Sequence, residues 1–251
     1  NTANPQLPAG GAALDVWAGL GDEPDYAAFN SLYWDEQYGE EFARYLAGPE
    51  GSAGLIDYVA NVTGRSDLTS DTVWAAWAGL DKDQQQPWLD GLEPDQRISF
   101  NSFVELVDAL VVWTNTATGR SDLLPTTAVA EYLALATDQQ RPLVQEFFFR
   151  ELRDSGRLAN LPQGNFGFAR GQTAIDTLFP AAQSWAGDLS LLFSRLYTLS
   201  GGDISLLVPG GLLNVGLAQP PANLPVTKQP SDLGIVAQGT GRVQVYSDGD
   251  V

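Results

Sequence analysis

The sequence contains no cysteine and no histidine, and its only lysines are Lys82 and Lys228. Disulfides, thiolate nucleophiles and imidazole bases are therefore excluded, together with the usual ligands of zinc, copper and haem iron. Neither lysine lies in a G-x-x-x-x-G-K-[ST] phosphate loop, which excludes nucleotide hydrolysis of that type. We expect no cofactor and no catalytic residue, and hence no enzyme; only carboxylates, hydroxyls and hard metal ions remain for chemistry.

Basic residues are also scarce, with 13 Lys and Arg against 31 Asp and Glu and a net charge of -18. Such a chain repels phosphate backbones and anionic lipid headgroups, so we expect no nucleic acid partner. No stretch approaches the roughly 18 apolar residues of a membrane span, and no membrane insertion is expected. The chain also begins without a signal-peptide pattern and stops within strand-like sequence, which indicates a fragment of a longer protein.

Hydrophobic periodicity divides the chain into three parts. Residues 1–21 include Leu14, Val16 and Ala18, which alternate with other residues as in a half-buried strand. Residues 22–185 place apolar side chains at helical spacing and predict an α-helical domain of six or seven helices. Residues 186–251 return to short alternating strands.

The helical part contains an internal duplication whose two copies are 55 positions apart. Residues 63–92 match residues 118–147, and the motif Thr-Gly-Arg-Ser-Asp-Leu begins each copy. The glycine is expected to end one helix in the left-handed conformation. Asp83 and Asp138 are candidate N-caps of a following helix, whose first turn would hold Pro87 and Pro142.

The last part repeats a corner tripeptide, Gly-Asp-[Leu/Ile/Val], at residues 187, 202 and 249. Short apolar alternations between such corners favour a solenoid over an antiparallel sandwich. The fold class predicted is therefore mixed: right-handed parallel β-helix rungs with an inserted, mostly α-helical domain. The opening strand should lie beside the strands after residue 187. Leu206 and Val243 should both point inward, and a charge at either should collapse this region.

Two stretches resemble the C-terminal region of filamentous-haemagglutinin-like exoproteins of two-partner secretion systems. They are residues 187–251, above all the Gly-Asp strand repeats, and residues 12–29. The resemblance implies a protein secreted by, or held on the outer surface of, a Gram-negative bacterium. It implies export through an outer-membrane transporter partner and an adhesive role towards a receptor on a host or neighbouring cell. The family motif carries no catalytic residues, so none is assigned here.

Candidate interaction residues come from the helical part. The duplicated loop could present the pairs Arg65 with Asp67 and Arg120 with Asp122, although helix capping also accounts for this motif. Trp34 and Tyr38 lie in an acidic stretch with Asp35, Glu36, Glu40 and Glu41, and favour an alternative function in glycan binding or carboxylate-dependent glycan cleavage. Core packing and a charged helix face account for the same residues.

Two further alternatives stay open at this stage. The chain could be a pure structural spacer. Asp248 and Asp250 flank a glycine turn and form a weak calcium candidate, which lacks the remainder of a calcium loop.

Overall fold

The computed structural model describes residues 12–19, 21, 23–48, 54–162, 166–192, 194–216 and 233–249, without the side chains of residues 35, 36 and 166. The chain divides into two compact units. The strand unit comprises Asn1–Pro24 and Phe179–Val251, and the helical unit comprises Asp25–Leu178. One unit is thus formed by both ends of the chain, and the other by its middle.

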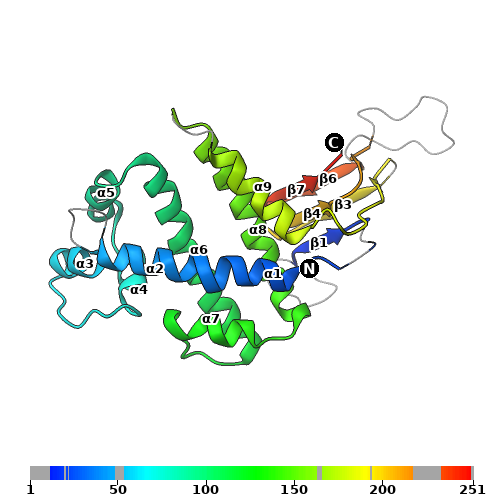
Figure 1. Ribbon diagram of the computed structural model, residues 1–251. Helices are drawn as coiled ribbons and strands as arrows, with labels where there is room; N and C mark the ends of the chain where they lie inside the picture. The colour runs from blue at the N-terminus through cyan, green and yellow to red at the C-terminus, as the bar shows by residue number, and fades with distance from the viewer. Residues whose placement is uncertain are drawn as a thin grey trace. The chain divides into compact units, whose positions relative to one another are not determined.

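The helical unit is predicted correctly as helical, but its described residues contain nine α-helices and one π-helix, more than the six or seven expected. Short helices escape a periodicity count because they hold fewer than two full turns of pattern. In chain order (Figure 1) they are α1 (Tyr26–Asn30), the π-helix η1 (Ser31–Gln37), α2 (Tyr38–Ala47), α3 (Leu55–Thr63), α4 (Val73–Ala78), α5 (Lys82–Asp90), α6 (Pro94–Thr118), α7 (Pro125–Leu133), α8 (Thr137–Ala159) and α9 (Phe166–Leu178).

The two copies of the repeated sequence adopt the same local structure. Helices α3 and α6 end at Thr63 and Thr118, and each is followed by a glycine in the left-handed conformation, with φ of 71° at Gly64 and 68° at Gly119. Each of these threonine hydroxyls donates to a carbonyl four residues earlier, at 2.7 Å. The glycine is required here because other residues adopt positive φ only at a cost.

In each copy, a glutamine side chain binds the carbonyls at the end of one helix. The Nε2 of Gln85 donates to the carbonyls of Trp77 and Leu80 at the end of α4. The Nε2 of Gln140 donates to the equivalent carbonyls of Tyr132 and Leu135 at the end of α7. These bonds satisfy carbonyls that a helix end leaves without an intrahelical partner.

The predicted N-caps are displaced by two residues. Asp81, not Asp83, caps α5, and its carboxylate accepts from the Gln84 backbone N–H at 2.8 Å. Asp138 likewise lies inside the first turn of α8. Pro87 and Pro142 consequently lie beyond the first turn, inside their helices. Sequence spacing does not distinguish these two positions, because an aspartate at the cap and one in the first turn are both favourable.

Aromatic side chains form the core of the helical unit. Trp34 packs on Tyr38, Tyr132 and Phe147, with ring centroids 5.2–5.6 Å apart. The contacts continue through Phe103 to Trp74, at 5.3 Å. Aromatic rings bury large apolar areas, so this cluster joins α2, α4, α6, α7 and α8 into one core.

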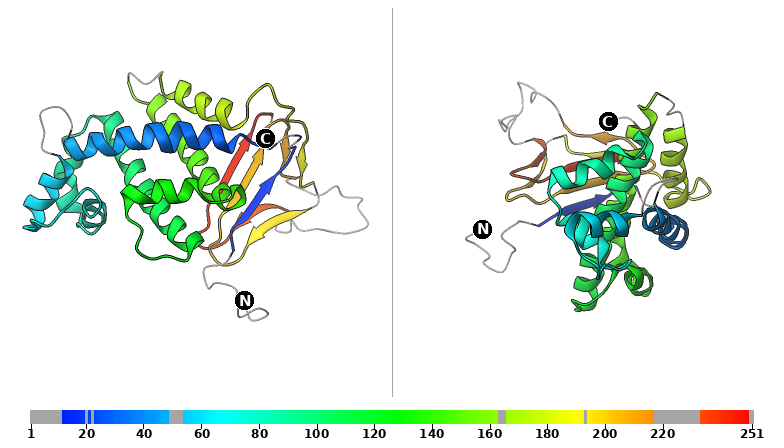
Figure 2. Two further views of the ribbon diagram at one scale, coloured as in Figure 1. Left: turned by 60° about the horizontal axis from the view of Figure 1, so that its bottom comes forward. Right: turned by 90° about the vertical axis from the view of Figure 1, so that its left-hand side faces the viewer.

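The described residues of the strand unit form three small parallel sheets, in the orders β1-β4-β7, β2-β5 and β3-β6. Their strands are β1 (Leu14–Trp17), β2 (Leu189–Ser190), β3 (Arg195–Thr198), β4 (Ile204–Val208), β5 (Leu213–Asn214), β6 (Gly234–Ala237) and β7 (Val243–Ser247). Leu14 pairs with Ile204, which pairs with Val243, so the three strands lie side by side (Figure 2). The prediction that the opening strand lies beside the strands after residue 187 is confirmed.

The prediction of right-handed parallel β-helix rungs is wrong. The structure is 54% helical, and the part that it describes contains only sheets of two or three strands, with no closed or curled rungs. Alternating apolar residues and glycine corners specify strands and turns, but not how separate sheets join. With strands as short as the two residues of β2 and β5, continuous coil faces do not form.

The repeated Gly-Asp corner links neighbouring strands. Asp203, just before β4, accepts from the Arg242 backbone N–H at 2.7 Å, just before the paired strand β7. Asp188, just before β2, accepts from Leu212 at 2.9 Å, just before β5. Each carboxylate thus satisfies an N–H where a parallel pair begins, which explains why aspartate recurs at this corner.

Inward packing is confirmed for β4 but not for β7. Leu206 is fully buried among apolar neighbours, whereas Val243 is 45% exposed. The difference arises because β4 lies between two strands and β7 is at the edge of its sheet. The prediction that Val243 is buried is therefore wrong.

Candidate interaction groove

The duplicated loops form local ion pairs. Arg65 donates from Nε and Nη2 to both carboxylate oxygens of Asp67, at 2.9 and 2.8 Å. Arg120 binds Asp122 in the same way, at 2.9 and 3.1 Å, and also contacts Glu131 at 3.0 Å. The arginine hydrogen bonds hold the pKa of each aspartate below its usual range. Each guanidinium is therefore already engaged by a carboxylate of its own loop.

Trp34 and Tyr38 lie inside the aromatic core rather than on the surface. Only 1% of Trp34 and 6% of Tyr38 is exposed. Together with Phe42 and Pro125 they line a depression of about 290 Å³. So little of either ring is exposed that stacking on an external glycan would require the core to open.

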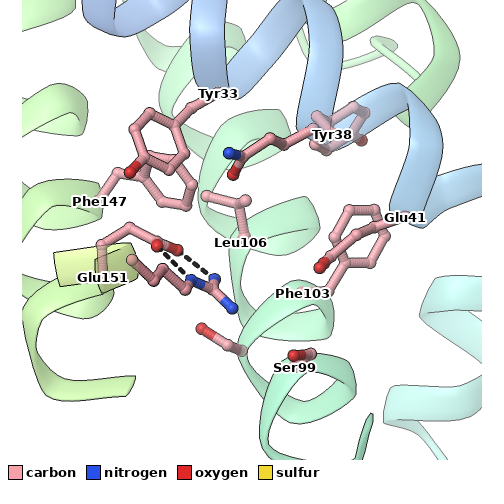
Figure 3. Close-up of a pocket in the computed structure, with 11 residues that line it drawn as sticks. Tyr33, Tyr38, Glu41, Ser99, Phe103, Leu106, Phe147 and Glu151 are labelled. Carbon is pink, nitrogen blue, oxygen red and sulfur yellow. Dashed lines mark hydrogen bonds and ion pairs between the residues drawn. The ribbon is translucent and has the colours of Figure 1, made fainter. Parts of the chain in front are cut away.

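A small polar cavity lies in the helical unit between α2, α6, α8 and α9 (Figure 3). Glu151 of α8 binds Arg170 of α9 through both carboxylate oxygens, and Glu41 of α2 and Ser99 of α6 face the same space. Its volume is about 20 Å³. A cavity needs about 10–15 Å³ for one water molecule, so this one has room for about one water and not for a sugar ring.

Glu41 is the titrating group of this cavity. Burial raises its pKa from the usual 4.5 to about 7, and Glu151 and Asp154 add to the rise, while Arg170 and Arg44 oppose it. The neighbouring Glu40 is exposed. Adjacent residues on a helix do not face each other, so these two carboxylates do not form a catalytic pair.

A larger groove lies between α4, α6 and the start of α7, and encloses about 500 Å³. Ligand pockets typically have volumes of about 300–1,000 Å³. Its walls are mostly apolar: Trp74, Ala75, Ala76, Ala78, Val104, Val107, Val111, Leu123, Leu124 and Pro125. Leu124 is 45% exposed at this groove. We call this feature the α4–α6 groove.

Charged and polar side chains at the α4–α6 groove are Arg65, Asp71, Thr72 and Asp108. Asp71 also joins the two sequence copies, since its Oδ1 accepts from the backbone N–H and the hydroxyl of Thr126, at 2.9 and 2.7 Å. These two residues occupy the same position in their respective copies. The groove is thus formed where one copy packs against the other.

The sequence pointed to only one residue of this groove, Arg65. The missed signal is a divergence between the copies, because Thr69-Ser70 in the first copy is replaced by Leu124-Pro125 in the second. That replacement supplies apolar lining where the copies meet, whereas the matched motif itself forms helix ends. Arg120, Asp122 and Asp67 do not line the groove.

The described residues offer no group of metal ligands and no membrane-spanning helix. Among the described residues no group of three or more acidic, His or Cys side chains could hold a metal ion. Asp248 is exposed in the strand unit, and Asp250 lies outside the described residues. No helix within the described ranges combines the length and apolar character of a bilayer span.

Comparison with protein-family models, with curated proteins and with solved structures found no match.

Proposed function

We propose that this chain is a non-catalytic interaction module of an exported bacterial surface protein, and that the α4–α6 groove contacts its partner. The groove carries the proposal, because it is an apolar concavity of about 500 Å³ with a large aliphatic side chain open to solvent. Exposed apolar patches of appreciable size typically mark interaction surfaces. The glycan-directed and structural-spacer alternatives receive less support from the geometry.

Export and location rest on the resemblance of residues 187–251 and 12–29 to filamentous-haemagglutinin-like exoproteins. On this proposal the protein is secreted or held on the outer surface of a Gram-negative bacterium, after passage through an outer-membrane transporter. The absence of cysteine suits a chain that crosses the periplasm unfolded. The partner is a receptor on a host cell or a neighbouring cell.

Two arguments favour the groove proposal over the glycan-cleavage and spacer alternatives. Glycan cleavage would need two facing carboxylates around a sugar, whereas the carboxylate-lined cavity holds only about 20 Å³. A pure spacer needs no open apolar groove, and such a groove lowers solubility unless a partner covers it.

A matched pair of variants tests the proposal. Ala75 lines the groove on α4, and Ala130 occupies the same position of the second copy on α7, where it is exposed and outside the groove lining. Ala75→Arg fills the groove, and Ala130→Arg adds the same charge elsewhere. Because both sites are exposed, both variants should keep the wild-type circular dichroism spectrum.

Binding of the fluorescently labelled chain to panels of epithelial and bacterial cells is then measured by flow cytometry. The proposal predicts that wild type and Ala130→Arg bind at least one cell type alike, while Ala75→Arg loses about tenfold or more in affinity, as expected for a blocked interface centre. Equal binding by the two variants, or no binding by wild type to any cell in the panels, would contradict it.

A further inference from the structure

The α4–α6 groove is elongated along a helix axis. Val104, Val107 and Val111 line one wall and span two turns of α6, or about 10 Å at 1.5 Å per residue. The opposite wall, on α4, consists largely of the small residues Ala75, Ala76 and Ala78. Small side chains on one wall and a two-turn apolar row on the other fit a helix that inserts residues at i, i+3, i+4 and i+7.

The charged side chains at the groove carry a net negative charge. Asp71 and Asp108 contribute two carboxylates, and Asp108 is exposed. Arg65, the cation at the groove, is engaged by both oxygens of Asp67. The net charge of -18 of the whole chain adds a long-range field that attracts cations.

We propose that the α4–α6 groove binds an amphipathic helix of a partner protein, with an apolar face seated between α4 and α6 and Lys or Arg residues beside Asp71 and Asp108. This inference rests on the proposed function and names the chemistry of the partner. Apolar burial supplies the affinity, and the two carboxylates fix the orientation of the helix and disfavour acidic competitors.

The probe is a fluorescent peptide of about 18 residues, long enough to be helical, with leucines at i, i+3, i+4 and i+7 and lysines elsewhere. Its counterpart replaces every lysine with glutamate and keeps the leucines. Fluorescence anisotropy with the full chain should show saturable binding of the lysine peptide and none of the glutamate peptide. Failure of the lysine peptide to bind would overturn the inference.

Variants separate binding in the groove from general attraction to an acidic protein. Asp108→Asn removes a carboxylate at the groove, and Asp83→Asn removes an exposed carboxylate of α5 outside it. A solvent-exposed ion pair contributes up to about 1 kcal/mol, so Asp108→Asn should weaken the peptide about two- to fivefold. Asp83→Asn should leave the affinity within error, and Ala75→Arg should lower it by about tenfold or more relative to Ala130→Arg.

Equal weakening by Asp108→Asn and Asp83→Asn would mean non-specific attraction and would overturn the inference.

Different results would overturn the proposed function and the helix-binding inference. Absence of peptide binding, with cell binding still lost in Ala75→Arg, would overturn the cationic helix and leave the interaction groove standing. Unchanged cell binding by Ala75→Arg, with specific peptide binding, would overturn the cellular role and leave the helix-binding groove standing.

Discussion

Glu41 should make the helical unit more stable in acid than at neutral pH. Its carboxyl lines the polar cavity, and burial raises its pKa to about 7. The folded state therefore holds the proton between pH 4.5 and 7, where an unfolded chain has released it. The free energy of unfolding falls as pH rises through this window, and the loss is complete above pH 7.

The magnitude follows from the rise in pKa. A change from 4.5 to about 7 corresponds to about 3 kcal/mol, because one pKa unit corresponds to about 1.4 kcal/mol. Glu41 is only half-buried, and water screens part of this energy. We therefore expect Glu41→Gln, which cannot ionise, to stabilise the protein above pH 7 by about 2 kcal/mol.

The assay is urea denaturation followed by far-UV circular dichroism, above pH 7 and below pH 4.5. Glu41→Gln should be more stable than wild type at the higher pH and equal to it at the lower. Glu40→Gln is the matched control, because it removes the same charge from the exposed neighbouring position. If Glu41→Gln is equally or less stable than wild type above pH 7, attraction to Arg170 and Arg44 outweighs burial and the reasoning is refuted.

Five other substitutions test burial, hydrogen bonding and ion pairing by thermal and urea denaturation. Leu206→Asp should unfold the strand unit, because an unpaired charge in a fully buried apolar site costs several kcal/mol, whereas Val243→Asp at the exposed sheet edge should be tolerated; similar losses would contradict the edge assignment. Gln140→Ala should cost about 2–3 kcal/mol, because it leaves buried carbonyls unpaired, and the half-buried Gln85→Ala should cost about 1 kcal/mol; the reverse order would contradict the burial difference. Arg120→Ala should leave the melting temperature unchanged, because its ion pairs are solvent-exposed; a large drop would show that the loop depends on them.

Local chemistry in the sequence was sufficient to predict several elements. Helical periodicity predicted the helical middle of the chain, and Thr-Gly predicted the two left-handed helix ends at Gly64 and Gly119. Alternation predicted strands on both sides, and the opening strand lies beside those after residue 187 as expected, through its pairing with β4. Each of these features is determined by residues within a turn or a strand, or by one register of apolar rows.

The features that the sequence did not predict depend on how separate elements pack together. Alternating residues define strand faces but not sheet closure, which is why the β-helix prediction was wrong. Glu151 and Asp154 lie on the apolar face of α8 between Phe147 and Leu158, a pattern that signals buried charge but does not name Arg170 as a partner. The α4–α6 groove arises between the two sequence copies, and no single element encodes it.

Amide hydrogen exchange of the full chain, with and without the lysine peptide, tests the central claim that the α4–α6 groove is the docking surface. The account predicts slower exchange in residues 71–78 and 104–111 on binding, with unchanged exchange in residues 126–133 of the second copy, which shares the sequence pattern but not the groove. Equal slowing in both copies, or slowing confined to other parts of the chain, would contradict it.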